Sequence, residues 1–103
     1  MSERMKLPQR RASESFSVEC HGLRYVATIS RFADGRVAEV FLQSHKAGSQ
    51  ADANARDAAV AASLCLQFGC PLEVLRRALL RDARGVASSP LGAAIDRLAE
   101  QSP

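Results

Sequence analysis

The spacing of apolar residues changes once along this chain of 103 residues, between Leu42 and Ala51. Before the change, apolar and polar residues alternate, which is the period-two pattern of strands with one buried face. After it, apolar residues recur at the spacing of helices. A block of strands followed by a block of helices predicts an α+β fold. We expect a three-stranded antiparallel β-meander followed by three helices packed on one face of the sheet.

The three strands are predicted at residues 14–20, 23–30 and 37–42, where β-branched and aromatic residues are frequent. Gly22 and the pair Asp34-Gly35 mark the turns between them, because tight hairpin turns favour glycine and Asp-Gly pairs. Turns this short join neighbouring antiparallel strands.

The alternation in the third strand indicates which residues lie on each face of the sheet. Ala38, Val40 and Leu42 are expected to point inward, with Val37 and Phe41 on the opposite face. Tyr25 or Val26 joins that opposite face, depending on the register. If the face is apolar and exposed, we expect a homodimer through it.

The first helix is predicted over Ala51–Phe68, with Ser49 as its N-cap and Gly69 after its end. One strip of its surface is polar and consists of Asp52, Arg56, Ser63 and Gln67. Alanines, Cys65, Leu66 and Phe68 fill much of the remaining surface. We therefore expect this helix to be the central, mostly buried element.

Two further helices are predicted in the last third of the chain. The second begins at Pro71, whose missing N–H is tolerated in a first turn, and is interrupted at Gly85. The third begins at Pro90 with Ser89 as its N-cap. Its inward stripe consists of Leu91, Ile95 and Leu98.

Positive charge is concentrated at the start of the chain. The net charge is +3, and the first thirteen residues hold this excess, with Arg4, Lys6, Arg10 and Arg11 against Glu3. We expect residues 1–13 to form a flexible basic arm, residues 14–100 a single neutral domain, and residues 101–103 a frayed end.

The sequence also bears on location and metal binding. It contains no signal-peptide-like or membrane-spanning apolar stretch, so we expect a cytoplasmic protein. Cys20, Cys65 and Cys70 form no C-x-x-C pair, and their odd number argues against a disulfide scaffold. We expect them to be small buried hydrophobes and expect no metal site.

Four motifs, in order, resemble one known family. They are Leu7–Arg11 (LPQRR), Phe32–Phe41 (FADGRVAEVF), Lys46–Ser49 (KAGS) and Leu64–Glu73 (LCLQFGCPLE). Together they resemble the TSCPD domain near the C-terminus of adenosylcobalamin-dependent (class II) ribonucleotide reductases. The resemblance runs from Leu7 to about Leu75 and continues less specifically through Gly92.

The resemblance implies a role in making deoxyribonucleotides, in which the cobalamin cofactor generates a thiyl radical that activates the ribose. The barrel that carries the radical cysteine and the cobalamin site has no counterpart in these residues, nor has the family's cysteine-rich tail. We therefore expect an accessory or interaction module that binds a reductase or another protein and is not an enzyme alone. Adenosylcobalamin is implied only for the full-length family, so no cofactor is expected in this chain. A stand-alone nucleotide-binding or small-anion-binding domain is the alternative.

The loop before the first helix is the candidate anion site. Lys46, Gly48 and the Ser49 hydroxyl, with the free N–H groups of the first helical turn, could hold a phosphate. The alternative is a capped helix with a solvated lysine.

Asn54 and Asp57 lie three residues apart near the edge of the helix's apolar surface. Arg36 or Arg31 from the sheet could be their partner, either in a structural hydrogen-bond network or as part of a ligand site.

Arg77 and Arg81, with Arg10 and Arg11 of the arm, are candidates for a partner-binding surface. Arg77, Arg81 and Arg84 share one helix face if the second helix extends that far. Such a surface could serve nucleic acid or an acidic protein. Acidic residues lie among these arginines and aromatic residues are scarce, so we do not expect nucleic acid as the partner.

Overall fold

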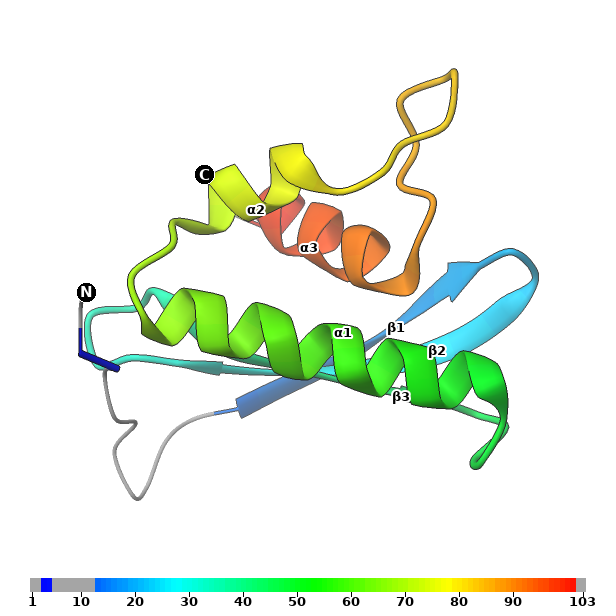
Figure 1. Cartoon of the computed structure of the whole chain (residues 1–103), viewed down its shortest axis with the longest axis horizontal. Helices are drawn as coiled ribbons and strands as arrows, with labels where there is room; N and C mark the ends of the chain where they lie inside the picture. The colour runs from blue at the N-terminus through cyan, green and yellow to red at the C-terminus, as the bar shows by residue number, and fades with distance from the viewer. Residues whose placement is uncertain (1–2, 5–12, 102–103) are drawn as a thin grey trace.

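Strands precede helices in the computed structural model, which describes residues 3–4 and 13–101 (Figure 1). The elements are β1 (Ser13–Cys20), β2 (Leu23–Arg31), β3 (Val37–Ser44), α1 (Gln50–Gln67), α2 (Leu72–Ala78) and α3 (Pro90–Gln101). The strands form one antiparallel sheet in the order β1-β2-β3. The predicted α+β fold is confirmed.

Both strand connections are tight turns at the predicted glycines. His21 and Gly22 link the paired residues Cys20 and Leu23, and both have positive φ, 51° and 77°. Two consecutive residues with positive φ are characteristic of a type I′ hairpin turn. In the second turn Gly35, with φ 94°, donates its N–H to the Phe32 carbonyl.

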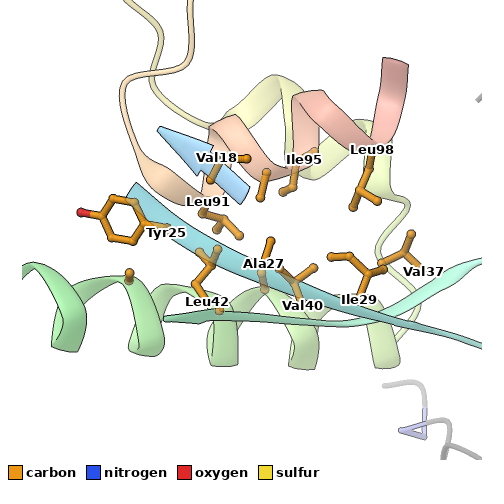
Figure 2. Packing of buried hydrophobic residues seen from close by; sticks show 14 of the residues in the cluster. Val18, Tyr25, Ala27, Ile29, Val37, Val40, Leu42, Leu91, Ile95 and Leu98 are labelled. Carbon is orange, nitrogen blue, oxygen red and sulfur yellow. The ribbon is translucent and has the colours of Figure 1, made fainter. Parts of the chain in front are cut away.

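The core lies between one face of the sheet and the helices α1 and α3. The sheet contributes Val18, Tyr25, Ala27, Ile29, Val40 and Leu42. The predicted stripe of α3 faces them, because Leu91, Ile95 and Leu98 are buried in the same cluster (Figure 2). The N-caps of both helices are confirmed. Ser49 Oγ accepts from Asp52 N at 3.1 Å, and Ser89 Oγ accepts from Gly92 N at 3.1 Å.

The polar strip of α1 faces the outer edge of β3 instead of solvent. Ser63 Oγ accepts from Val40 N at 2.9 Å and donates to Val40 O at 3.1 Å. Gln67 Nε2 donates to Ala38 O at 3.1 Å, and Asp52 Oδ1 accepts from Ser44 N at 2.9 Å. These side chains bond backbone groups of β3 that none of the described strands pairs, so α1 covers this edge of the sheet.

The prediction that apolar residues fill the buried side of α1 was therefore only partly right. Ala55, Ala59, Ala62 and Leu66 are in the core, but Cys65 and Phe68 are exposed. Val60 and Leu64 are exposed as well, and with Phe68 they form a stripe at spacing i, i+4, i+8. The polar strip of α1 contacts the outer edge of β3, and the apolar stripe therefore lies on the outer side of the helix.

Val37 is buried, which corrects the prediction that it lies on the open face with Phe41. The β2–β3 register shifts there, because Ser30 pairs with Glu39 and Arg31 pairs with Val37. Such a bulge breaks the alternation of side chains, so Val37 and Ala38 are both buried.

Helix α2 ends at Ala78, so the predicted face of Arg77, Arg81 and Arg84 does not form. Arg81 instead lies in an isolated β-bridge with Ala87, in the connection to α3.

Most of the predicted basic arm lies outside the described residues, and Ser13 already belongs to β1. Gln101 is the last residue of α3, and the other two residues of the predicted frayed end lie outside the description.

Candidate functional site

The loop that leads into α1 wraps around a carboxylate of the chain itself. Asp52, only 4% exposed, accepts hydrogen bonds from Ser44 N and from Gly48 N, the latter at 3.2 Å. Arg56 Nε adds an ion pair at 3.0 Å. The hydrogen bond from the Ser44 N–H is the main cause that lowers the pKa of Asp52, and the Gly48 N–H and Arg56 lower it further.

This arrangement occupies most of the donors that the sequence suggested for an external anion. Gly48 donates to Asp52, and the Ser49 hydroxyl donates to the Lys46 carbonyl at 2.8 Å. The Lys46 side chain is exposed. The loop therefore resembles a capped helix start with an internal anion.

Asn54, Asp57 and Arg36 do not come together. Asn54 and Asp57 are both exposed on α1, and Asn54 Oδ1 accepts from Gln50 Nε2 at 3.0 Å. Arg36 pairs with Asp34 at 2.7 Å and lies over the Phe32 ring, with 5.1 Å between guanidinium carbon and centroid. Arg31 pairs with Glu14 at 3.1 Å. The acidic partner of Arg36 lies in the β2–β3 turn and that of Arg31 lies in β1, whereas Asn54 and Asp57 lie on α1.

The candidate partner-binding arginines are also separated. Arg77 is exposed and pairs with Glu73 at 3.4 Å. Both terminal nitrogens of Arg81 bind Asp96, at 2.8 and 2.7 Å, and Arg76 Nε binds the same carboxylate at 3.0 Å. The Arg81 hydrogen bond is the main cause that lowers the pKa of Asp96. Arg10 and Arg11 lie outside the described residues.

A pocket of about 400 Å³ lies where α1 and α3 begin. We call it the helix-start pocket. Alanines of α1, with Pro90 and Leu91 of α3, make its apolar walls, and Asn54 and Ser89 add polar groups. Tyr25 of β2 also lines it. Figure 2 shows the Tyr25 hydroxyl pointing away from the other core residues, at the end of the cluster where both helices begin.

Sequence reasoning missed this pocket. It placed Tyr25 on one of two faces depending on register, whereas pairing with Ser44 puts Tyr25 on the buried face. The one available signal was chemical, since tyrosine is an amphipathic residue whose hydroxyl needs a partner when it is buried.

A second pocket of about 400 Å³ lies on the open side of the sheet. Val26 and Phe41 of the sheet and Val60 of α1 line it, together with Arg56. Val26, Phe41 and Val60 are each about half exposed. They continue into Leu64 and Phe68 of the α1 stripe, and we call these five residues the apolar face.

Potential metal ligands are dispersed over residues 3–4 and 13–101. No three His, Cys, Asp or Glu residues there lie close enough together to hold a metal ion. His21 Nε2 and His45 Nδ1 each lie within 3.0 Å of a backbone carbonyl oxygen, Ser88 O and Arg24 O. None of the described helices is both long and apolar enough to span a membrane.

The fold and these surfaces define a small α+β domain with one pocket at the starts of α1 and α3 and another on the open side of the sheet. A stretch of the vitamin B12-dependent ribonucleotide reductase of Agrobacterium fabrum is 39% identical over 71 residues, which is 69% of this chain and 6% of that enzyme. The enzyme of the same name from Bradyrhizobium diazoefficiens is 34% identical over 73 residues, 71% of this chain and 6% of the enzyme. The resemblance to these reductases predicted from the motifs is confirmed.

The chain thus spans about 6% of the length of the curated relatives it matches. No protein-family model matches it, and no solved structure matches it.

Proposed function

We propose that this chain is an accessory module of a vitamin B12-dependent ribonucleotide reductase, acting by binding the enzyme and not by catalysis of its own. The observation that carries the proposal is the extent of the similarity. About seventy residues of a much longer enzyme are matched by most of one small α+β domain. The chain therefore corresponds to a structural piece of the reductase, consistent with the predicted TSCPD domain.

The apolar face is the surface we assign to the reductase. A solvent-exposed apolar patch on a small domain is unfavourable in water and is typical of surfaces that a partner covers. The five residues come from the open side of the sheet, in β2 and β3, and from the outer side of α1 and its C-cap, so a partner would contact the sheet and the helix at once. Arg56, half exposed beside the patch, adds a positive charge at its rim.

The first test is binding of the purified chain to the cobalamin-dependent reductase of its own cell, by co-elution with and without nucleotides. We expect a complex, and expect Val60→Asp to weaken it by about tenfold or more, because a carboxylate would be buried against apolar surface. Val86→Asp is the matched control, since Val86 is 52% exposed and Val60 is 53% exposed. Val86 lies in the connection between α2 and α3, away from α1 (Figure 1).

Absence of any complex, together with unchanged reductase turnover, would overturn the proposal. If Val60→Asp and Val86→Asp weaken the complex equally, the apolar face is not the surface that binds the reductase. The chain alone, supplied with ribonucleotide, adenosylcobalamin and a dithiol, is expected to give no deoxyribonucleotide. The proposal includes the cytoplasmic location expected from the sequence.

The alternative is nucleotide or small-anion binding at the Lys46–Ser49 loop. It has less support, because the Gly48 N–H and the Ser49 hydroxyl are engaged within the chain. The nucleotide arms of the co-elution experiment test this alternative directly.

A further inference from the structure

Two accessible cysteine thiols lie at the end of α1. Cys65 is exposed and Cys70 is partly exposed, and only Cys20 is buried, which corrects the expectation that all three cysteines are buried. Cys65 is in the last turn of α1, and Cys70 lies in the connection from α1 to α2 (Figure 1). Accessible thiols can react with other sulfur compounds, whereas buried structural ones are inert.

The way in which α1 ends brings Cys65 and Cys70 together. Cys70 N donates to the Cys65 carbonyl at 2.9 Å, and Gly69 N donates to the Leu66 carbonyl at 3.1 Å. Gly69 has a φ of 102°, a conformation that glycine adopts without strain. These two hydrogen bonds define a Schellman motif, in which the side chains at the positions of Cys65 and Cys70 are frequently in contact. The helix ending therefore makes neighbours of two cysteines that are five residues apart in the sequence.

The hydrogen bond between the two residues also limits the distance that a disulfide would have to span. With standard bond lengths, the 2.9 Å bond from Cys70 N to Cys65 O leaves their Cα atoms no more than about 6.8 Å apart. Disulfides usually join residues whose Cα atoms lie about 4.4–6.8 Å apart. The Cys70 thiol donates to the Pro71 carbonyl at 3.5 Å, and because thiols are weak donors this contact is readily exchanged. A Cys65–Cys70 disulfide is thus within reach while α1 stays helical.

We propose that Cys65 and Cys70 form a reversible redox site that exchanges with an external disulfide. The more exposed Cys65, as thiolate, attacks one sulfur of that disulfide, which forms a mixed disulfide and releases one thiol. Cys70, as thiolate, then attacks Cys65 Sγ, which closes the Cys65–Cys70 bond and releases the second thiol. The pair loses two electrons and two protons, and the two released thiols carry them. This inference goes beyond the accessory role proposed above and does not depend on it.

The test is equilibration of the full chain with reduced and oxidised glutathione, followed by alkylation of the remaining thiols and mass analysis of tryptic peptides. Cys65 and Cys70 lie in one tryptic peptide, residues 57–76, and Cys20 lies in another. We expect the peptide of residues 57–76 to lose two hydrogen atoms and Cys20 to remain a thiol. Dithiothreitol is expected to reverse the change.

The chain unfolded in urea is the control for the helix ending. There a short flexible segment joins the two thiols, and they meet at an effective concentration on the order of 1 mM. With reduced glutathione at about 1 mM, closed and mixed disulfides are then expected in roughly equal amounts. In the folded chain we expect the ratio of closed to mixed disulfide to be about tenfold higher, because the Schellman motif holds the thiols together.

Cys70→Ser tests the order of the two steps. We expect this variant to keep glutathione on Cys65 as a lasting mixed disulfide, because no second thiol releases it. The proposal is overturned if the folded chain closes no Cys65–Cys70 disulfide, or if the ratio of closed to mixed disulfide is the same in the folded and the unfolded chain. It is also overturned if Cys65 in Cys70→Ser takes up no glutathione.

Discussion

Ser63 shows how a single small side chain can satisfy two backbone groups. Its hydroxyl bonds both the N–H and the carbonyl of Val40, on the edge of β3 that faces α1. Ser63→Ala would leave both groups buried without this partner, and we expect it to lower the free energy of unfolding by about 1–3 kcal/mol. Chemical denaturation measures the loss.

Asp57→Ala is the control for that measurement, because it makes an alanine on the same helix at an exposed position. We expect it to change stability by no more than about 0.5 kcal/mol. Equal stability of Ser63→Ala and the unmodified chain would show that water replaces the hydroxyl at the strand edge.

At the scale of elements, two carboxylates hold neighbouring segments together. Asp52 joins the β3–α1 loop to the start of α1, and Asp96 of α3 holds Arg76 and Arg81 on either side of the end of α2. The folded state lowers the pKa of both, so the unfolded chain binds more protons as pH falls below the ordinary value of 3.8. Their contribution is complete above that pH and is lost as pH falls through the lower pKa of the folded state.

We therefore expect stability to fall on acidification from about pH 5 towards pH 2, with a smaller fall in Asp96→Asn, whose side chain does not ionise. Denaturant midpoints across this range test the expectation. The same pH dependence in Asp96→Asn and in the unmodified chain would assign the acid sensitivity to other carboxylates.

At the scale of the whole molecule, the apolar face also bears on self-association. Stable dimers bury about 800 Å² per partner, and an exposed apolar face can supply the centre of such an interface. The homodimer expected from the sequence stays a prediction. We expect light scattering at roughly tens of micromolar to give a mass approaching two chains of 11.1 kDa, reduced to one chain by Val60→Asp. A mass of one chain for the unmodified protein would contradict it.

The elements of the fold could be predicted because their signals are local. The change of period after Leu42, the glycines of the two turns, and the caps Ser49 and Ser89 each act within a few residues, and the structure has all of them. The family resemblance was likewise carried by short motifs in order. The functional sites were harder to predict than the elements, because Lys46, Asn54 and Arg81 were chosen by residue type without knowledge of their neighbours in space.

The sequence by itself thus determined the order of the strands and helices and the turns between them. Only the tertiary structure decided which side of α1 is buried, because the unpaired edge of β3 needs hydrogen-bond partners and Asp52, Ser63 and Gln67 provide them. It also decided that Tyr25 lies beside the starts of α1 and α3. The buried side of α1 and the place of Tyr25 depend on strand pairing and helix packing between segments far apart in the sequence. The periodicity of a single segment does not predict such contacts.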